Sequence, residues 1–433
     1  MSGVIIMKKR KLAVLISAYL ISASAAHAVP LSDDKSLEFH GYGMVAGDFK
    51  SDYDRPKSMR LHMDPTGPHQ DPRGKMGDLG NTYWHDYFSS LAVTKKWQDV
   101  GAPGQSADFT YQMVGYGDKG FETAQMFGNF AGVTVLPKDS KIWIGRRYID
   151  ERVGVFAYNT KEVHFDAGIG YNSTDFDLAV GTAQVDWSGS ARPAEAVEGG
   201  RRIADAVYRL GATELGITYV EELDDPVRQQ EEQNAVSVSA KYTLSSFMGL
   251  TSGNTIFKAQ YGQGVIAQYL NTSRISQISE QDDSSMRFTM DGTIDAIDGF
   301  TIKPVVIFEY TDRDNTVPRI SSLIDADGGV AHSYGSEDET GIFAGFDVQQ
   351  KLNQNWSMLY EANVNNTQNK DGNNGANGTA YKFAMGPALQ LQVQPGVAPI
   401  ASLTAAYVGG DQAITELPTA SEWRFGYRME VWF

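Results

Sequence analysis

The sequence predicts an all-β protein, a closed antiparallel transmembrane β-barrel of about 18 strands. Three observations predict this fold: apolar and polar residues alternate in short segments, long and short connections alternate between them, and the chain starts with a leader typical of export. The 433 residues include 21 Tyr, 20 Phe and 44 Gly but no Cys, so disulfides cannot hold the fold together. A closed barrel fits these features because closure leaves no strand edge unpaired.

The leader is the segment MKKRKLAVLISAYLISASAAHA, which opens at Met7. It has a basic start, an apolar core over 12–21 and an ending of small residues at 26–28 that fits a cleavage site. The apolar run is shorter than the roughly 20 residues of a membrane-spanning helix. We therefore expect residues 1–28 to be a signal peptide, with Met7 as the functional start, and residues 29–433 to form the barrel domain.

Residues 422–433 show the alternation most clearly. Side chains of a strand point to opposite faces in turn, so this segment has an apolar face for lipid and a polar face for a lumen. The apolar set is Phe425, Tyr427, Met429, Val431 and Phe433, and the opposite set is Arg424, Arg428, Glu430 and Trp432. Similar patterns occur in 235–243, 298–310, 355–366 and 379–392.

Turn signals divide the chain into 18 such segments. Long polar connections follow mostly the odd-numbered strands and short ones mostly the even-numbered strands, which is typical of a bacterial outer-membrane barrel. The expected strands are 37–47, 83–94, 108–116, 121–136, 140–148, 163–170, 175–183, 201–209, 213–221, 235–243, 255–266, 284–292, 298–310, 340–350, 355–366, 379–392, 397–408 and 422–433. An ordinary secreted β-protein is the alternative for the same alternation.

The charge of the chain argues against nucleic acid as a partner. The formal net charge is −16, and because four of the cations precede residue 29, the remainder carries about −20. The expected location is the bacterial outer membrane, with outer-membrane lipid around the barrel.

No motif in the sequence predicts an enzyme, a cofactor or a metal. A GxGxxG pattern at 115–120 precedes a strand-like run instead of a helix, so a hairpin turn explains it. The Asp/Gly-rich segments 325–329 and 371–375 lack the glutamate that completes a calcium loop. No HExxH or GxSxG motif is present. An outer-membrane hydrolase with Ser and His on different strands stays open as an alternative.

Two aromatic residues on the polar faces of the terminal strands suggest a ligand. Trp432 shares its face with Arg428 and Glu430, and Tyr42 shares its face with Glu38 and His40. In a closed barrel the two strands are neighbours, so the rings are expected to adjoin inside the channel. Aromatic rings beside charged groups suit a sugar, which has an apolar ring face and polar hydroxyls. The alternative is that both rings belong to the interfacial aromatic girdle.

The chain also resembles the maltoporin family of sugar-specific outer-membrane porins. The resemblance lies in LEFHGY at 37–42, LGN at 79–81, KIWIGRRY at 141–148 and SEWRFGYRMEVWF at 421–433. It implies an 18-stranded barrel, a homotrimer, an inward-folded third loop and a line of lumen aromatics along which oligosaccharides move, called the aromatic slide here. It places Tyr42, Tyr87 and Trp432 on the slide.

The sequence departs from the family pattern elsewhere. Asn254 and Leu352 stand at about the positions of two slide aromatics, Met44, Asp78 and Glu122 replace arginines of the polar track, and the first-loop disulfide is impossible without Cys. We expect Arg147, Glu151 and Arg152, at the start of the third loop, to shape the constriction.

These features predict a sugar-selective porin that allows facilitated diffusion of oligosaccharides, maltodextrin-like or of another kind, through a trimeric channel. Its lumen should tolerate cations and bind long glucans weakly. A general diffusion porin without saturable sugar binding is the main alternative, because the line of aromatics is thin.

Overall fold

The computed structural model describes residues 29–32, 34, 36–48, 79, 87–116, 120–152, 159–184, 200–222, 233–264, 282–312, 319–320, 333–334, 339–369, 377–391, 399–411 and 421–432. Residues 1–28, which the sequence predicts to be a signal peptide, lie outside the described residues. In the described residues no helix is long and apolar enough to cross a membrane.

The described chain forms 21 β-strands, of which 18 are long enough to make a barrel wall. β1 (Val29–Pro30), β15 (Arg319–Ile320) and β16 (Ser333–Tyr334) have two residues each. The long strands are β2 (Leu37–Asp48), β3 (Tyr87–Gln98), β4 (Ser106–Tyr116), β5 (Phe121–Ala131), β6 (Lys141–Arg152), β7 (Asn159–Asn172), β8 (Phe176–Gln184), β9 (Gly200–Leu210), β10 (Thr213–Glu222), β11 (Gln233–Phe247), β12 (Thr251–Gln263), β13 (Ser284–Ile294), β14 (Phe300–Asp312), β17 (Glu339–Lys351), β18 (Trp356–Asn369), β19 (Gly378–Gln390), β20 (Ile400–Gly410) and β21 (Ser421–Trp432).

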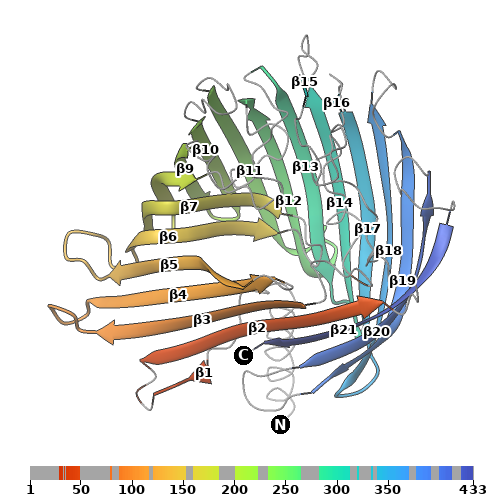
Figure 1. Ribbon diagram of the computed structural model, residues 1–433, viewed down its shortest axis with the longest axis horizontal. Coiled ribbons are helices and arrows are strands. Elements are labelled where there is room, and N and C mark those ends of the chain that lie inside the picture. Colours follow the sequence, from red (N-terminus) through yellow and green to blue (C-terminus); the bar gives the residue numbers. More distant parts are fainter. Residues whose placement is uncertain are drawn as a thin grey trace.

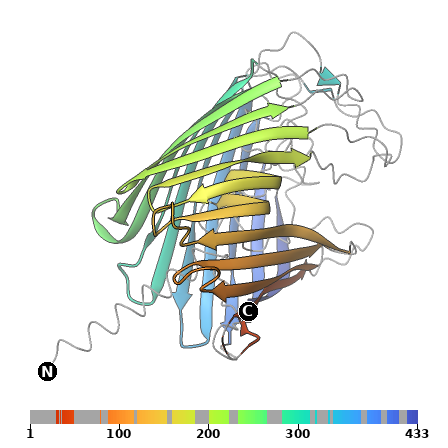
Figure 2. The same ribbon diagram turned by 90° about the vertical axis from the view of Figure 1, so that its left-hand side faces the viewer.

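Each long strand pairs antiparallel with its neighbours in the chain, and β2 also pairs with β21, which closes the barrel. Figure 1 shows this seam, with β2 in red beside the blue β21. Figure 2 shows the strands coloured orange to green inclined side by side along one wall. The prediction of a closed antiparallel barrel of 18 strands is confirmed, and every expected strand overlaps an observed one.

The connections have the expected asymmetry. On one edge they are 99–105, 132–140, 173–175, 211–212, 248–250, 295–299, 352–355 and 391–399. On the other edge they include the long spans 49–86, 185–199, 264–283 and 313–338. Short turns at one edge and long spans at the other are typical of outer-membrane barrels.

The two faces of the wall differ in the way that the alternation predicts. On β21 the side chains of Trp423, Phe425 and Met429 are more than half exposed, while Arg424 and Glu430 are buried on the opposite face. Exposed apolar side chains recur on the same face around the barrel, so we call this the outer face and the opposite one the inner face. An outer face of this composition is stable in contact with lipid.

One sector of the barrel is filled by its own side chains. A buried apolar cluster joins the inner faces of six consecutive strands, β6 to β11; its members are Trp143, Val163, Phe165, Ala179, Ala183, Ile203, Val220 and Ala235. Trp143 and Phe165 have no exposed surface, and their ring centres are 5.6 Å apart. The wall therefore bends sharply here, so that β6 and β7 pack onto the inner faces of the strands that follow.

The connection between β6 and β7, which corresponds to the expected third loop, is shorter than the sequence predicted. The span 149–162 was expected to be a loop, but β6 and β7 stay paired through Ile149 with Val163 and Glu151 with Lys161. Only 153–158 separates the two strands, and this segment lies outside the described residues. The apolar cluster and the ion pairs on the inner face allow the charged end of β6 to continue the strand instead of forming a loop.

Gly145 allows β5 and β6 to approach each other at the start of this bend. Its φ is +132°, and a Cβ at this position would lie 2.3 Å from the carbonyl oxygen of Met126 and 2.8 Å from the Cα of Phe127. We expect Gly145→Ala to lower the free energy of unfolding by about 1–3 kcal/mol, measured by urea titration in liposomes. Gly120→Ala is the control, since nothing lies within 4 Å of its Cβ position. Equal unfolding midpoints for both variants would contradict this account.

Candidate functional site

A row of three aromatic rings lies on the inner face across the seam of the barrel. Tyr42 on β2 pairs with Trp432 on β21, and their ring centres are 5.4 Å apart. The ring of Phe88 on β3 lies 5.6 Å from that of Tyr42 on its other side. All three side chains are partly exposed, so they line space that is open to solvent. The structure thus brings Tyr42 and Trp432 together, and we call Trp432, Tyr42 and Phe88 the aromatic row.

The strand register places Phe88 at the third position of the row, on the inner face. Tyr87 pairs with Val45, whose side chain is on the outer face, whereas Phe88 pairs with Met44 on the inner face. The side chain of Tyr87 lies outside the described residues. Because successive residues of a strand point to opposite faces, a shift of one residue decides which ring can reach the lumen. The assignment of Tyr87 from the family resemblance stays a prediction, and Phe88 is the ring that lies beside Tyr42.

Polar groups border the aromatic row on both sides. The Tyr42 hydroxyl donates to Glu430 Oε1 at 3.1 Å, and Glu430 also contacts Arg428. On the other side, Ser90 pairs with Tyr42 and begins a polar row across three strands. Gln112 Nε2 donates to Ser90 Oγ at 2.7 Å, and Gln125 Nε2 donates to Gln112 Oε1 at 2.6 Å. Hydroxyl, amide and charged groups therefore surround an apolar surface.

Arg147 lies on the inner face of β6 between two rings. Its guanidinium carbon is 4.8 Å from the centre of the Phe127 ring and 5.1 Å from that of the Trp143 ring. A bulge between Gly145 and Arg147 sets this orientation. Cation–π contacts of this kind hold an arginine in one conformation at a partly buried site. Arg147 thus joins the edge of the apolar cluster to the wall formed by β5.

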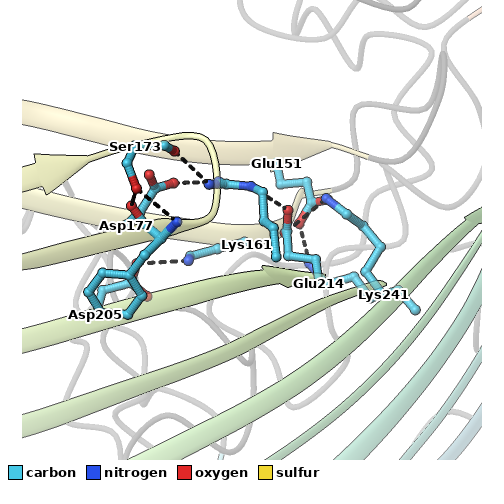
Figure 3. Close-up of polar contacts among 10 residues, drawn as sticks. Glu151, Lys161, Ser173, Asp177, Asp205, Glu214 and Lys241 are labelled. Atoms are coloured by element: carbon cyan, nitrogen blue, oxygen red, sulfur yellow. Dashed lines mark hydrogen bonds and ion pairs between the residues drawn. The ribbon is translucent and has the colours of Figure 1, made fainter. Parts of the chain in front are cut away.

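Glu151 holds the end of β6 against the far wall (Figure 3). Its carboxylate lies 2.7 Å from Lys241 Nζ on β11 and 2.5 Å from Lys258 Nζ on β12. Along the sheet, β6 and β11 are five strand spacings apart, which is about 24 Å. Direct contact is possible only because the wall bends, so the ion pairs fix the end of the β6–β7 hairpin at the inner face of β11 and β12.

Further polar contacts support the same junction. The Gln260 amide donates to the carbonyl oxygen of Thr160 at 2.7 Å, and Lys161 Nζ lies 2.8 Å from Asp205 Oδ2. Figure 3 shows Lys161 and Asp205 beside the pair of Glu214 and Lys241, whose atoms are 2.9 Å apart. We call these residues, together with Glu151 and Lys258, the hairpin junction. Of these residues only Glu151 was predicted from the sequence, although the alternation in 235–243 already indicates an inward position for Lys241.

The site residues predicted from the sequence thus lie in two separate parts of the barrel. Tyr42 and Trp432 belong to the aromatic row, while Arg147 and Glu151 belong to the β6–β7 hairpin and its junction. Arg152 ends β6 and pairs with Asn159, but its side chain lies outside the described residues, as does Asp78.

Among the positions that depart from the family pattern, Met44 is buried on the inner face, and Leu352 falls in the turn between β17 and β18.

Leu79, the first residue of the LGN segment, reaches the inner wall. The backbone N–H of Leu79 donates to Glu361 Oε2 on β18 at 2.8 Å, and Glu361 pairs with Lys382 on β19 at 2.6 Å. The connection between β2 and β3 therefore contacts the wall of β18 and β19 at this residue.

Comparison with known proteins decides the family. The family model described as LamB porin matches residues 37–433, which include all the long strands. The chain belongs to the LamB porin family. It is an outer-membrane porin, a channel built as a multi-pass β-barrel.

Solved structures similar to this porin have low sequence identity. A carbohydrate-binding β-barrel of Escherichia coli involved in group 1 capsule assembly, Wzi, is 10% identical with a TM-score of 0.46, covering 92% of this chain and 84% of its own. An anion-selective porin of Comamonas acidovorans is 10% identical, with a TM-score of 0.39 and coverages of 92% and 98%. OccK10 of Pseudomonas aeruginosa is 7% identical, with a TM-score of 0.47 and the same coverages. No curated protein sequence matches the porin significantly.

The register makes a prediction about the third ring of the aromatic row. If the aromatic row binds sugar, Phe88→Ala should weaken sugar-dependent block of the channel current by about threefold or more, because one ring contact is lost. Tyr87→Ala on the same strand is the matched control and should leave the block unchanged. Single-channel recording in planar bilayers measures both variants. A stronger effect of Tyr87→Ala would mean that the observed register does not describe the working channel.

The hairpin junction predicts a difference in stability. Glu151→Gln leaves Lys241 and the buried Lys258 without their shared carboxylate, so the free energy of unfolding should fall by about 3 kcal/mol. Glu221→Gln is the control, since its partner Arg202 is largely exposed and the change should be within about 1 kcal/mol. Urea titrations of both variants in liposomes test this expectation. A loss for Glu221→Gln as large as that for Glu151→Gln would refute it.

Proposed function

We propose that this porin is a sugar-selective channel for facilitated diffusion of oligosaccharides, maltodextrin-like or of another kind. The observation that carries the proposal is the aromatic row of Trp432, Tyr42 and Phe88 on the partly exposed inner face. Solute moves down its gradient, and no covalent chemistry is part of the proposal. Membership of the porin family and the closed barrel support a channel, and the three aromatic rings support a preference for sugar.

The chemistry of the row fits a pyranose ring. The C–H face of a sugar is apolar and gains contact with the ring faces, while its hydroxyls need hydrogen-bond partners at the edges. Glu430 and Arg428 offer such groups beside Trp432, and Ser90 and Gln112 offer them beyond Tyr42. Because the three rings adjoin at 5.4 and 5.6 Å, a sugar can leave one ring as it contacts the next.

Arg147, Glu151 and Arg152 are proposed to shape the constriction through the β6–β7 hairpin. The apolar cluster occupies the sector behind this hairpin, and the junction at Glu151 keeps the hairpin inside the barrel. Solute must then pass between the hairpin and the wall that carries the aromatic row. In this account Arg147 and Glu151 act by holding the hairpin in place more than by touching sugar.

The proposal includes the processing and assembly of the chain. Residues 1–28 are removed on export, residues 29–433 form the channel domain, and three copies assemble in the outer membrane. The apolar outer face supports contact with lipid, and the family resemblance supports the homotrimer.

A general diffusion porin is the second candidate. The shortness of the aromatic row favours it, since Leu352 and Asn254 stand where the family pattern has aromatic residues. Such a channel would conduct ions but would show no saturable block by any sugar.

Trp432→Ala distinguishes the two candidates. If the aromatic row binds sugar, this variant should raise the concentration for half-maximal current block about tenfold, equivalent to about 1.4 kcal/mol of lost binding. Trp423→Ala is the matched control, because Trp423 is on the same strand but 61% exposed on the outer face. The measurement is single-channel current with a panel of oligosaccharides in planar bilayers. Block that is unchanged in Trp432→Ala would reject the role of the row, and absence of block by every sugar would favour general diffusion.

A further inference from the structure

The β6–β7 hairpin leaves the barrel wall, so it presents two faces inside the barrel. Within the described strands, the pairing of β6 with β5 ends at Arg146, and the pairing of β7 with β8 begins at Ala167. Beyond these points the Tyr148 N–H donates to Gln125 Oε1 at 3.0 Å, and Gln125 belongs to the inner polar row on β5. One face of the hairpin, with Phe165, is buried in the apolar cluster. The opposite face is therefore the one that the hairpin turns toward the rest of the interior.

Four side chains of this opposite face form a connected cluster. The Tyr148 ring stacks on the His164 ring, with ring centres 3.8 Å apart and planes inclined by 18°. Arg146 Nη2 donates to the Tyr148 hydroxyl at 3.0 Å, and Arg146 Nε lies 3.3 Å from Asp166 Oδ1. All four side chains are partly exposed. We call Arg146, Tyr148, His164 and Asp166 the hairpin platform, in which a flat aromatic surface adjoins a cation and an anion.

The polar row links the hairpin platform to the aromatic row. At one end Ser90 pairs with Tyr42 in the strand register, and at the other end Gln125 accepts the Tyr148 N–H. Gln112 lies between them and bonds to both Ser90 and Gln125. From β2 to β6 this series of contacts crosses four strand spacings, which is about 19 Å along the wall. Two aromatic surfaces therefore lie at opposite ends of one continuous band of amide and hydroxyl groups.

We propose that the hairpin platform is a second sugar-binding subsite, which contacts one part of a long oligosaccharide while the aromatic row holds another part. This inference rests on the sugar selectivity proposed above and adds a subsite and a dependence on chain length. The stacked rings offer a surface for the apolar face of a pyranose, and Arg146 and Asp166 offer donors and acceptors for its hydroxyls. When two parts of one molecule bind, the second contact forms within the complex, so affinity rises for a chain that reaches both subsites.

The charges of the hairpin platform favour a neutral sugar. Asp166 lies directly beside Arg146, so the carboxylate offsets the charge that would otherwise attract an acidic sugar. A carboxylate accepts hydrogen bonds and a guanidinium donates them, so the pair serves the hydroxyls of a neutral sugar in both senses.

The length dependence of current block tests the proposal. Tyr148→Ala should raise the concentration of a long neutral oligosaccharide for half-maximal block about tenfold, but that of a disaccharide by less than about twofold. Tyr148→Phe keeps the ring and should restore block by the long sugar. Tyr219→Ala is the matched control, because Tyr219 is on the outer face of β10. Retention of the compact form on unheated gels shows that each variant is folded.

The same recordings separate this inference from the function on which it rests. If the wild-type channel is blocked by sugar and Tyr148→Ala behaves like the wild type, the platform has no role in binding and the inference is overturned. A loss of equal size for short and long sugars would also overturn it, because a hairpin displaced as a whole does not discriminate by length. If no sugar blocks the wild-type channel, the proposed sugar selectivity itself fails, and the platform with it.

Thiol labelling tests the position and the ligand of the platform independently, because the chain has no cysteine of its own. A water-soluble, cationic methanethiosulfonate should lower the conductance of Tyr148→Cys, and a long neutral oligosaccharide should slow this reaction. Tyr219→Cys on the outer face should show neither effect. An unreactive Tyr148→Cys would place the platform outside the channel, and better protection by an acidic oligosaccharide would contradict the preference for a neutral one. Either result overturns the proposal.

Discussion

Everything in this porin depends on the hydrogen-bonded pairing of β2 with β21. Inside a bilayer no water can satisfy a backbone N–H or C=O group, so a sheet that spans the membrane must close on itself. Pairing at this seam removes the last free edges and brings together residues that are 388 positions apart, such as Tyr42 and Glu430. The aromatic row crosses the same seam, so the candidate sugar site exists only in the closed barrel.

Closure alone would give a barrel with an open interior. The bend at β6 and β7 fills part of this interior. The apolar cluster behind Trp143 excludes water from one sector, while Glu151 keeps the hairpin end on β11 and β12. Burying Lys258 is costly unless a carboxylate lies beside it, so the hairpin and the far wall stabilise each other. Partly exposed inner residues are found instead on β2 to β5 and at the end of β21, beside the aromatic row.

The sequence predicted the strands well because alternation is a local property of a two-faced sheet. All 18 strands and the neighbouring positions of Tyr42 and Trp432 followed from it. The place of Phe88 beside Tyr42 did not follow from it, since this place depends on a register set by the partner strand β2. The length of β6 was also missed, because the partners that allow Glu151 to lie inside the barrel are on β11 and β12. Contacts across the lumen leave no periodic signal within one strand.

Aromatic residues illustrate that the function of a side chain in a barrel depends more on the face on which it lies than on its residue type. On β21, Trp423 and Trp432 have the same side chain, but one lies on the outer face and the other on the inner face beside Tyr42. Trp423 stacks near Phe425 at 6.3 Å, as expected for rings in an interfacial girdle. Trp432 instead adjoins a tyrosine hydrogen-bonded to a carboxylate, which gives an apolar surface with a polar border. That combination fits the proposed solute, a sugar with an apolar and a polar surface, whereas lipid needs only an apolar surface.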